Sequence, residues 1–263
     1  VGQQAAGRLI PAFLELGGKD PAIVMACADI ANTSRALLRS GAGATGQACM
    51  SLERIYVDEN IFQPLLTQLV SDAKACSLNY PDISRGQLGP IIFKPQAEKI
   101  AAQLQDARDK GATIHCGGEV RELGGGLWCE PTVISDITDD MLLMREETFG
   151  PLLPVITFKS TAQAIAMAND SEFGLSASVF AGSNEKAIAV AEKINAGAVG
   201  INDASLTVFV NDVEKESFGH SGLGGSRMGD AGLLRFLRKK ALLIQNAEAM
   251  PLQAFDESNN HQK

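Results

Sequence analysis

The chain has little of the chemistry that marks metal-binding or disulfide-bonded proteins. Its five cysteines include no Cys-x-x-Cys pair, and with only three histidines there is no Cys/His cluster of the spacing that holds zinc. We therefore expect no metal site. An odd number of cysteines without paired spacing is typical of a reducing compartment, so we expect a cytoplasmic protein.

Basic charge and long apolar runs are scarce as well. The 23 lysines and arginines are outnumbered by 31 acidic residues, which gives a formal net charge of −8 and a pI near 5.0. Nucleic acids and acidic membrane surfaces attract basic faces, so neither is an expected partner. No apolar run reaches the length that crosses a bilayer. With 45% hydrophobic residues, the 263 residues suit one large or two smaller globular domains.

What the sequence does contain is an alternation of short branched apolar runs with helical patterns. The predicted strands are residues 21–26, 54–58, 152–158, 176–181 and 198–202, and the predicted helices are 61–76, 95–110, 161–167 and 184–195. This alternation predicts an α/β fold with a mostly parallel sheet and flanking helices. Ligands on such sheets bind at the carboxyl ends of the strands, so we expect the site there.

Glycine-rich stretches and the C-terminal region complete the chain. Residues 41–46, 117–126 and 219–229 are predicted loops. Residues 233–244 are apolar and basic, and we interpret them as a helix end that runs into an edge strand, which invites pairing with another chain. From residue 246 onward the composition is polar, which predicts a disordered tail.

Two residues that lie near glycines carry the most informative chemistry. Cys49 lies in GQACMSLER at 46–54, and Glu15 lies in LELGGK at 14–19. A thiol and a carboxylate suit covalent acyl chemistry on an aldehyde, because a thiolate is both a strong nucleophile and a tolerable leaving group. The remaining cysteines fit the commoner role of a small buried hydrophobe: Cys27, Cys76, Cys116 and Cys129.

Four separated segments form one combined signature. They are LELGGK at 14–19, GQAC at 46–49 followed by Arg54, PTV at 131–133 leading to EETFGP at 146–151, and FGLSASV at 173–179. In this order and spacing, over roughly residues 1–203, they resemble the C-terminal half of the NAD(P)-dependent aldehyde dehydrogenases. The resemblance implies an aldehyde-dehydrogenase-like catalytic domain that oxidises an aldehyde to a carboxylic acid with NAD or NADP.

The resemblance also implies catalytic roles. Cys49 would be the nucleophile that forms a thiohemiacetal and then a thioester, and Glu15 would be the base that activates the hydrolytic water. A carboxylate serves as a base near neutral pH when burial raises its pKa. The apolar neighbours of Glu15 are compatible with such burial: Phe13, Leu14 and Leu16. The alternative for Glu15 is a solvated or salt-bridged carboxylate.

Four residues are implied to hold the cofactor. Glu147 would hold the ribose hydroxyls on the nicotinamide side, since hydrogen bonds from a diol to a carboxylate are charge-assisted and directional. Phe149 would position the nicotinamide ring, and the backbone at Leu16 would face the nicotinamide amide. Gly2 resembles the tail of a dinucleotide-binding loop. The alternative for Glu147 is a surface charge at a strand edge.

The chain departs from the family pattern around the substrate. Residues 41–45 are small where relatives usually carry aromatic residues and an asparagine, so we expect a wide tunnel and a bulky or aromatic aldehyde. Leu206 and Phe209 are candidate walls of the substrate pocket, with core packing as the alternative. In the variant segment 217–229, Arg227 stands where an acid is common.

The resemblance divides the chain into four parts. Residues 1–15 would be a remnant of the cofactor-binding domain, 16–217 the catalytic domain, 218–245 a return segment with an oligomerisation strand, and 246–263 a tail. The first residue is Val1, and we expect most of the cofactor domain and the asparagine of the oxyanion hole to lie upstream. The implied assembly is a homodimer or homotetramer.

Two other functions remain open. One is a CoA-acylating relative, in which CoA takes the acyl group in place of water; Glu15 favours hydrolysis, because an acylating enzyme does not need that base. The other is a truncated chain without dehydrogenase activity that acts as an oligomerising module.

Overall fold

A seven-stranded sheet forms the centre of the protein. The computed structural model describes residues 1–256. The strand order is β11-β10-β2-β3-β8-β7-β4, and every neighbouring pair is parallel except β4 with β7. The strands are β2 (Asp20–Val24), β3 (Leu52–Asp58), β4 (Thr113–Ile114), β7 (Thr132–Ser135), β8 (Leu152–Phe158), β10 (Ser176–Phe180) and β11 (Ala198–Ile201). The α/β class and the mostly parallel sheet predicted from the sequence are confirmed.

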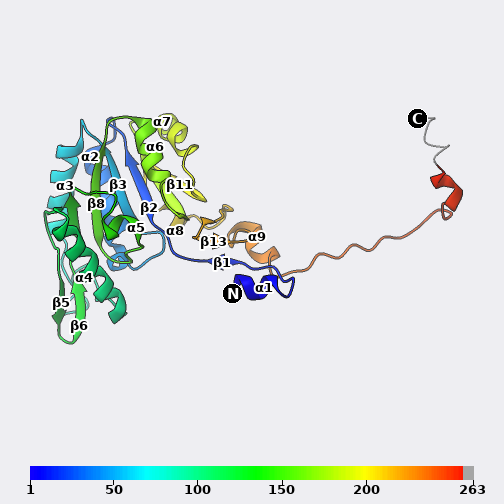
Figure 1. Ribbon diagram of the computed structural model, residues 1–263, viewed down its shortest axis with the longest axis horizontal. Coiled ribbons are helices and arrows are strands. Elements are labelled where there is room, and N and C mark those ends of the chain that lie inside the picture. The colour runs from blue at the N-terminus through cyan, green and yellow to red at the C-terminus, as the bar shows by residue number, and fades with distance from the viewer. Residues whose placement is uncertain (257–263) are drawn as a thin grey trace.

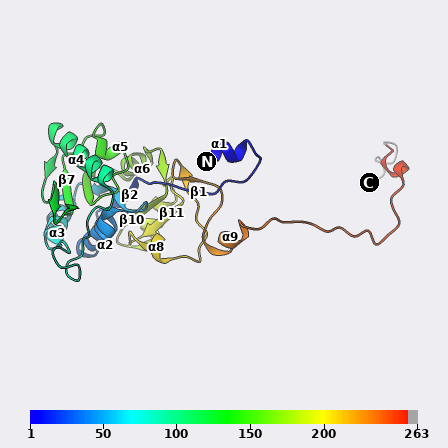
Figure 2. The same cartoon turned by 90° about the horizontal axis from the view of Figure 1, so that it is seen from below.

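Helices cover both faces of this sheet (Figure 2). On one face lie α2 (Ile30–Ala42) and α3 (Phe62–Lys74); on the other lie α4 (Lys94–Asp109), α5 (Leu142–Arg145), α6 (Thr161–Asn169) and α7 (Asn184–Ala191). Successive strand residues point to opposite faces, so Ile55 and Val57 pack with α2 and α3 while Tyr56 packs with α6. Because both faces are covered, β2 and β3 are buried along almost their whole length.

Capping residues explain where several helices begin and end. Asp29, Ser160 and Ser183 accept hydrogen bonds from backbone N–H groups of α2, α6 and α7, which satisfies donors that a helix cannot pair internally. Helix α4 ends at Asp109, and Gly111 adopts a φ of +88°, as expected for a glycine that terminates a helix. The predicted helices 95–110, 161–167 and 184–195 begin within one residue of α4, α6 and α7, whereas α2 was not predicted.

Several expectations about loops were wrong. Residues 30–42 form α2, and 43–46 continue as the 3₁₀ turn η1 (Gly43–Gly46), so 41–46 is not a flexible loop. Residues 117–126 include part of a hairpin of β5 (Val120–Leu123) and β6 (Gly126–Cys129). Glycine content alone misled here, because packing against the sheet and strand pairing override a local preference for turns.

Two arms meet beside the sheet. The N-terminal arm contains α1 (Gly2–Ala6) and β1 (Leu14–Glu15), and β1 pairs with β13 (Gly222–Leu223) of the return segment. A second short pair joins β12 (Phe218–Gly219) to β9 (Phe173–Gly174). The arms extend away from the helices that flank the sheet, and the return segment continues into α9 (Gly229–Leu234) (Figure 1). Residue 15 is therefore held in place by a segment more than two hundred residues later in the sequence.

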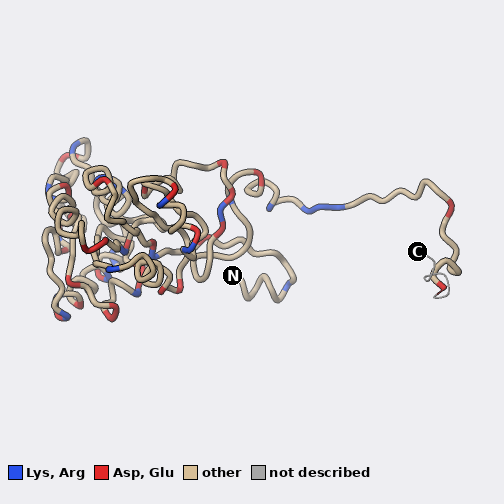
Figure 3. The backbone as a smooth tube through the Cα atoms, turned by 90° about the horizontal axis from the view of Figure 1, so that it is seen from above, with Lys and Arg blue, Asp and Glu red and all other residues tan. Residues whose placement is uncertain are grey.

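The segment after α9 does not form the predicted edge strand. From residue 238 to Pro251 it has no helix or strand within the described chain, and then η2 (Leu252–Phe255) follows. It leaves the body of the protein as an extended stretch that carries a run of basic residues (Figure 3). A strand requires a neighbouring strand for its backbone hydrogen bonds, and none pairs with this segment within residues 1–256. The predicted disordered tail, 246–263, falls partly on residues 257–263, which lie outside the described residues.

Candidate active site

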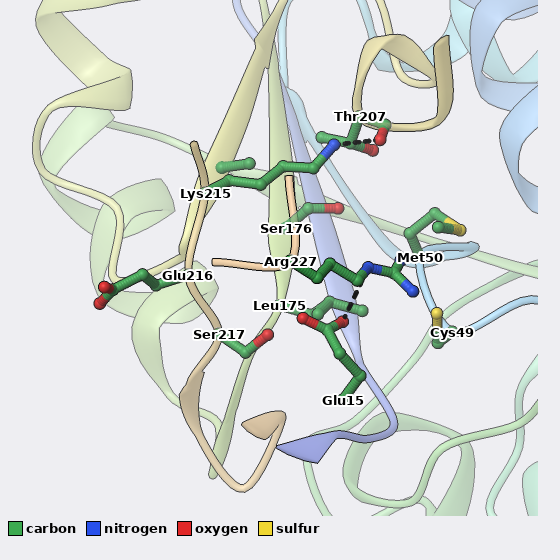
Figure 4. Close-up of a pocket in the computed structure, with 11 residues that line it drawn as sticks. Glu15, Cys49, Met50, Leu175, Ser176, Thr207, Lys215, Glu216, Ser217 and Arg227 are labelled. Atoms are coloured by element: carbon green, nitrogen blue, oxygen red, sulfur yellow. Dashed lines mark hydrogen bonds and ion pairs between the residues drawn. The ribbon is translucent and has the colours of Figure 1, made fainter. Parts of the chain in front are cut away.

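Cys49 and Glu15 line the same small pocket, of about 30 Å³. Glu15 comes from β1, and Cys49 lies between η1 and β3. The walls also include Ser176 at the start of β10, Ala198 at the start of β11, and Arg227 from the return segment (Figure 4). The structure thus brings together the two residues that the sequence singled out.

The pocket lies at the amino ends of the strands, so the expectation of a site at their carboxyl ends was wrong. Cys49 precedes β3, Glu15 precedes β2, and Ser176 and Ala198 begin their strands. The reason is the pairing of β1 with β13, which brings the N-terminal arm and the return segment to this edge. The rule for open parallel sheets does not foresee an added pair of arms.

A left-handed turn delivers the thiol to the pocket. Ala44, Thr45 and Gly46 all have φ between +51° and +69°, a conformation that is costly for residues with a Cβ. The Thr45 hydroxyl donates to the Gly89 carbonyl at 2.9 Å, and the Gln47 amide oxygen accepts from the Ile92 N–H at 2.9 Å. These bonds hold the turn against the segment that precedes α4.

The surroundings of Cys49 favour the neutral thiol. Burial raises the pKa of the Cys49 thiol, and the negative charges of Asp20, once it is ionised, and of Glu15 act in the same direction. The charge of Arg227 and the backbone N–H of Cys49 itself lower that pKa. Because only the thiolate is strongly nucleophilic, Arg227 is the side chain that favours the reactive form.

Glu15 is not buried as expected. Its side chain keeps 32% of its accessible surface, and Phe13 and Leu16 beside it are also exposed. The Arg227 Nε atom lies 3.6 Å from Glu15 Oε2, so the salt-bridged alternative describes this structure. The cause is the position of Glu15 on a two-residue strand of the N-terminal arm, outside the packed core.

Glu147 reaches the glycine pair that follows Glu15. Its Oε1 accepts a hydrogen bond from the Gly18 N–H at 2.9 Å, and burial raises the pKa of its carboxyl group. A Cβ on Gly17 would lie 2.5 Å from both carboxylate oxygens, and one on Gly18 would lie 2.4 Å from the Cys49 carbonyl oxygen. Only glycine permits this close approach of the Glu15 segment to Cys49 and Glu147.

A buried ion pair missed by the sequence reasoning holds Phe149. Lys19 donates to Glu53 Oε2 at 2.7 Å, and both side chains are about 1–2% exposed. Glu53 also accepts from the backbone N–H groups of Thr148 and Phe149 at 2.7 and 2.8 Å. These bonds stabilise the left-handed φ of +51° at Phe149. The signal in the sequence was Glu53 next to Arg54, two adjacent charged residues at the start of a strand that is otherwise mostly apolar.

Asp20 is a second buried group that the sequence reasoning missed. Ser176 donates to its carboxylate through both the backbone N–H, at 3.2 Å, and the hydroxyl. Burial raises the pKa of Asp20 to about 8, although the Ser176 hydrogen bonds lower it. Ser176 lines the pocket and donates to Asp20, so Asp20 lies next to the pocket. Its carboxyl group is largely protonated at neutral pH.

This pKa predicts a pH-dependent stability. Between about pH 4 and pH 8 the folded state keeps the Asp20 proton that the unfolded chain has lost, so the free energy of unfolding falls as pH rises through this window. Asp20→Asn cannot ionise, and we expect it to unfold at higher urea than the native chain at pH 8 but not near pH 4. The expected gain at pH 8 is on the order of a few kcal/mol.

Urea titrations at several pH values measure this effect. Asp212→Asn, at an exposed position, is the matched control and should follow the native chain at every pH. A native chain and an Asp20→Asn variant with parallel pH profiles would contradict the prediction.

The remaining candidates lie in different places. Leu206 and Phe209 are on α8 (Leu206–Phe209) and are 40% and 69% exposed, so the core-packing alternative is wrong for both. Phe209 lines an apolar pocket of about 270 Å³ with Ala44 and Met50, and Leu206 lines another pocket of about 240 Å³ with Lys215.

Gly2 does not join the group around Glu147. It begins the five-residue helix α1, and a Cβ there would contact Leu14 and Leu223. Within residues 1–256 no group of three or more His, Cys, Asp or Glu side chains is arranged to hold a metal ion. No helix in that range is long and apolar enough to cross a membrane.

Comparisons with known proteins point to one family. The model of the "Aldehyde dehydrogenase family" matches residues 1–242. A betaine aldehyde dehydrogenase of Brucella anthropi is 34% identical over 245 residues, which are 92% of this chain and 50% of that protein. The chain thus spans about half the length of the curated relatives it matches.

Solved structures give the same result. A putative aldehyde dehydrogenase, PutA, from Anabaena variabilis superposes with a TM-score of 0.94 at 50% identity, covering 97% of this chain and 55% of that one. Lactaldehyde dehydrogenase from Escherichia coli superposes with a TM-score of 0.84 at 32% identity, covering 90% of this chain and 49% of that one. An NAD⁺ complex of aldehyde dehydrogenase from Bacillus cereus superposes with a TM-score of 0.83 at 32% identity, covering 89% of this chain and 47% of that one.

Proposed function

The chain belongs to the aldehyde dehydrogenase family, and from this premise we propose that it carries the catalytic part of an enzyme that oxidises an aldehyde to a carboxylic acid with NAD or NADP. The observation that supports this most directly is the shared pocket of Cys49 and Glu15. We assign catalysis to residues 16–217 together with Glu15, the remnant of a cofactor-binding domain to 1–15, and the return segment to 218–245.

Cys49 and Glu15 divide the chemistry between them. The Cys49 thiolate adds to the aldehyde carbon and forms a carbon–sulfur bond, which gives a tetrahedral thiohemiacetal. A nicotinamide cofactor, when bound, would supply the hydride acceptor that the oxidation requires. Cys49 then holds the acyl group as a thioester. Glu15 takes a proton from water as the water oxygen attacks the acyl carbon, and the carbon–sulfur bond breaks to release the acid and the thiolate.

The residues around Glu147 fit one end of such a cofactor. Glu147 accepts the Gly18 N–H through Oε1, and Leu16 and Phe149 each lie two residues along the chain from one end of this hydrogen bond. We propose that these three residues hold the nicotinamide and its ribose. Gly2 stays a prediction, since α1 lies away from this group.

A bulky or aromatic aldehyde is the proposed substrate. The pocket of about 270 Å³ between η1 and α8 is walled mainly by apolar and small side chains, and Met50 links it to the pocket of Cys49. A larger side chain at Ala44 would narrow this space. An aromatic ring fits a hollow of this size and polarity.

Aldehyde-dependent reduction of NAD⁺ and NADP⁺, followed by absorbance, tests the proposal. Benzaldehyde is expected to give a kcat/KM at least about tenfold above that of acetaldehyde, because about five additional apolar carbons are buried. The product is expected as free benzoate. Product found only as a thioester after CoA is added would favour the CoA-acylating alternative, and a higher kcat/KM with acetaldehyde would contradict the proposed substrate.

The non-catalytic alternative makes a different prediction. A chain that folds and self-associates but reduces neither cofactor with any aldehyde would favour an oligomerising module. We propose a homodimer or homotetramer, because the segment 233–244 exposes three consecutive large apolar side chains: Leu242, Leu243 and Ile244.

A further inference from the structure

Charged side chains of both signs line the pocket of Cys49. Arg227 and Lys215 both line it, and Glu15 is the acidic side chain that faces them. Glu216 belongs to the same wall, but its carboxylate points away from Cys49 (Figure 4). The Lys215 ammonium points toward Thr207, so a reacting molecule meets Arg227 and Glu15 beside the thiol and Lys215 farther along the wall (Figure 4).

Arg227 is placed to contact that molecule. In Figure 4 its guanidinium lies between the Glu15 carboxylate and the Cys49 thiol. The ion pair with Glu15 runs through Nε at 3.6 Å, and among the described residues the guanidinium has no hydrogen-bond acceptor at normal distance. Its side chain is 38% exposed. A guanidinium keeps five N–H donors in a fixed plane, so most of them remain for a second anion.

Lys215 adds a second cation. Its ammonium donates to the main-chain carbonyls of Thr207 and Val210 and has no carboxylate within salt-bridge distance in the described chain. Burial and the charge of Arg227 lower its pKa, as expected for two cations close together without enough anions between them. A bound anion would relieve this repulsion.

We propose that the aldehyde substrate carries a carboxylate and that Arg227 is the specificity-determining residue that binds it. This inference rests on the proposed function, since it takes Cys49 as the reacting thiol. A carboxylate matches the planar donors of a guanidinium through two parallel hydrogen bonds. The apolar pocket beyond Met50 accommodates the rest of the molecule. A cationic aldehyde is disfavoured by the same charges.

Aldehyde protection of Cys49 tests this without any cofactor. Addition of an aldehyde to the thiolate is reversible and blocks alkylation, so iodoacetamide labelling of Cys49, located by mass spectrometry, reports aldehyde binding. The probes are 4-formylbenzoate and its uncharged methyl ester. The acid is expected to protect at about a fivefold lower concentration than the ester, and Arg227→Met is expected to remove the difference. Arg227→Lys retains the positive charge and should keep part of the preference for the acid.

Arg85→Met is the matched control, because that arginine is 87% exposed in a distant loop and should leave the preference unchanged. Equal protection by acid and ester in the native chain, or a preference that survives Arg227→Met, would overturn the inference and leave the proposed function standing. A Cys49 that iodoacetamide labels but neither aldehyde protects would contradict the proposed function as well. Loss of the preference at high salt would support the inference.

Discussion

Replacing Cys49 with alanine is expected to lower the rate at which the chain hydrolyses p-nitrophenyl acetate by about a thousandfold or more, to the rate of the buffer. Ester hydrolysis needs the nucleophile and the base but no hydride acceptor, so it tests the pocket directly. Cys49 lines that pocket with Glu15 and is half-buried, while its thiol pKa is raised by burial. The native rate should therefore increase with pH as the thiolate forms.

Cys116→Ala is the matched control for this experiment. Cys116 is also half-buried with a raised thiol pKa, but its sulfur donates to the Pro131 carbonyl and lies outside the pocket. The control should hydrolyse the ester at the native rate. A Cys49→Ala variant that keeps more than about a tenth of the native rate would show that another group is the nucleophile.

Much of the fold was predictable because it depends on local patterns. The strands β2, β3 and β8 are buried on both faces and read as short apolar runs, and α4 is marked by its apolar face and by Gly111 at its end. Cys49 and Glu15 were also identified correctly as neighbours, since each lies in a segment with a recognisable order of residues.

What the sequence did not reveal depends on contacts between distant segments. The exposure of Glu15 and its pairing with Arg227 follow from the meeting of β1 with β13, which no local pattern encodes. The Lys19–Glu53 pair was missed for the same reason. An acidic residue in a strand normally marks a solvent-facing side, and only the approach of Lys19 makes its burial possible.

The charges around Cys49 also bear on how Glu15 acts. Glu15 lies next to Arg227, and about a third of its side chain is exposed to solvent. Water therefore reaches its carboxylate. A base in this position takes its proton from a water that lies between its carboxylate and the acyl carbon on Cys49. Its task then belongs to the second half of the reaction, after the acyl group has been transferred to sulfur.

Glu15→Gln is therefore expected to separate the two halves. Acylation of Cys49 by p-nitrophenyl acetate should still give a burst of nitrophenolate close to one equivalent, while steady-state turnover falls by about 10²–10⁴-fold because the amide cannot accept the proton. Intact-mass measurement should show the acetylated chain accumulating.

Glu216→Gln, on the same wall but pointing away from the thiol, is the control and should keep native turnover. Turnover near the native rate in Glu15→Gln would show that another group activates the water. Loss of the burst together with turnover would place Glu15 in the attack step instead, as the base that deprotonates Cys49.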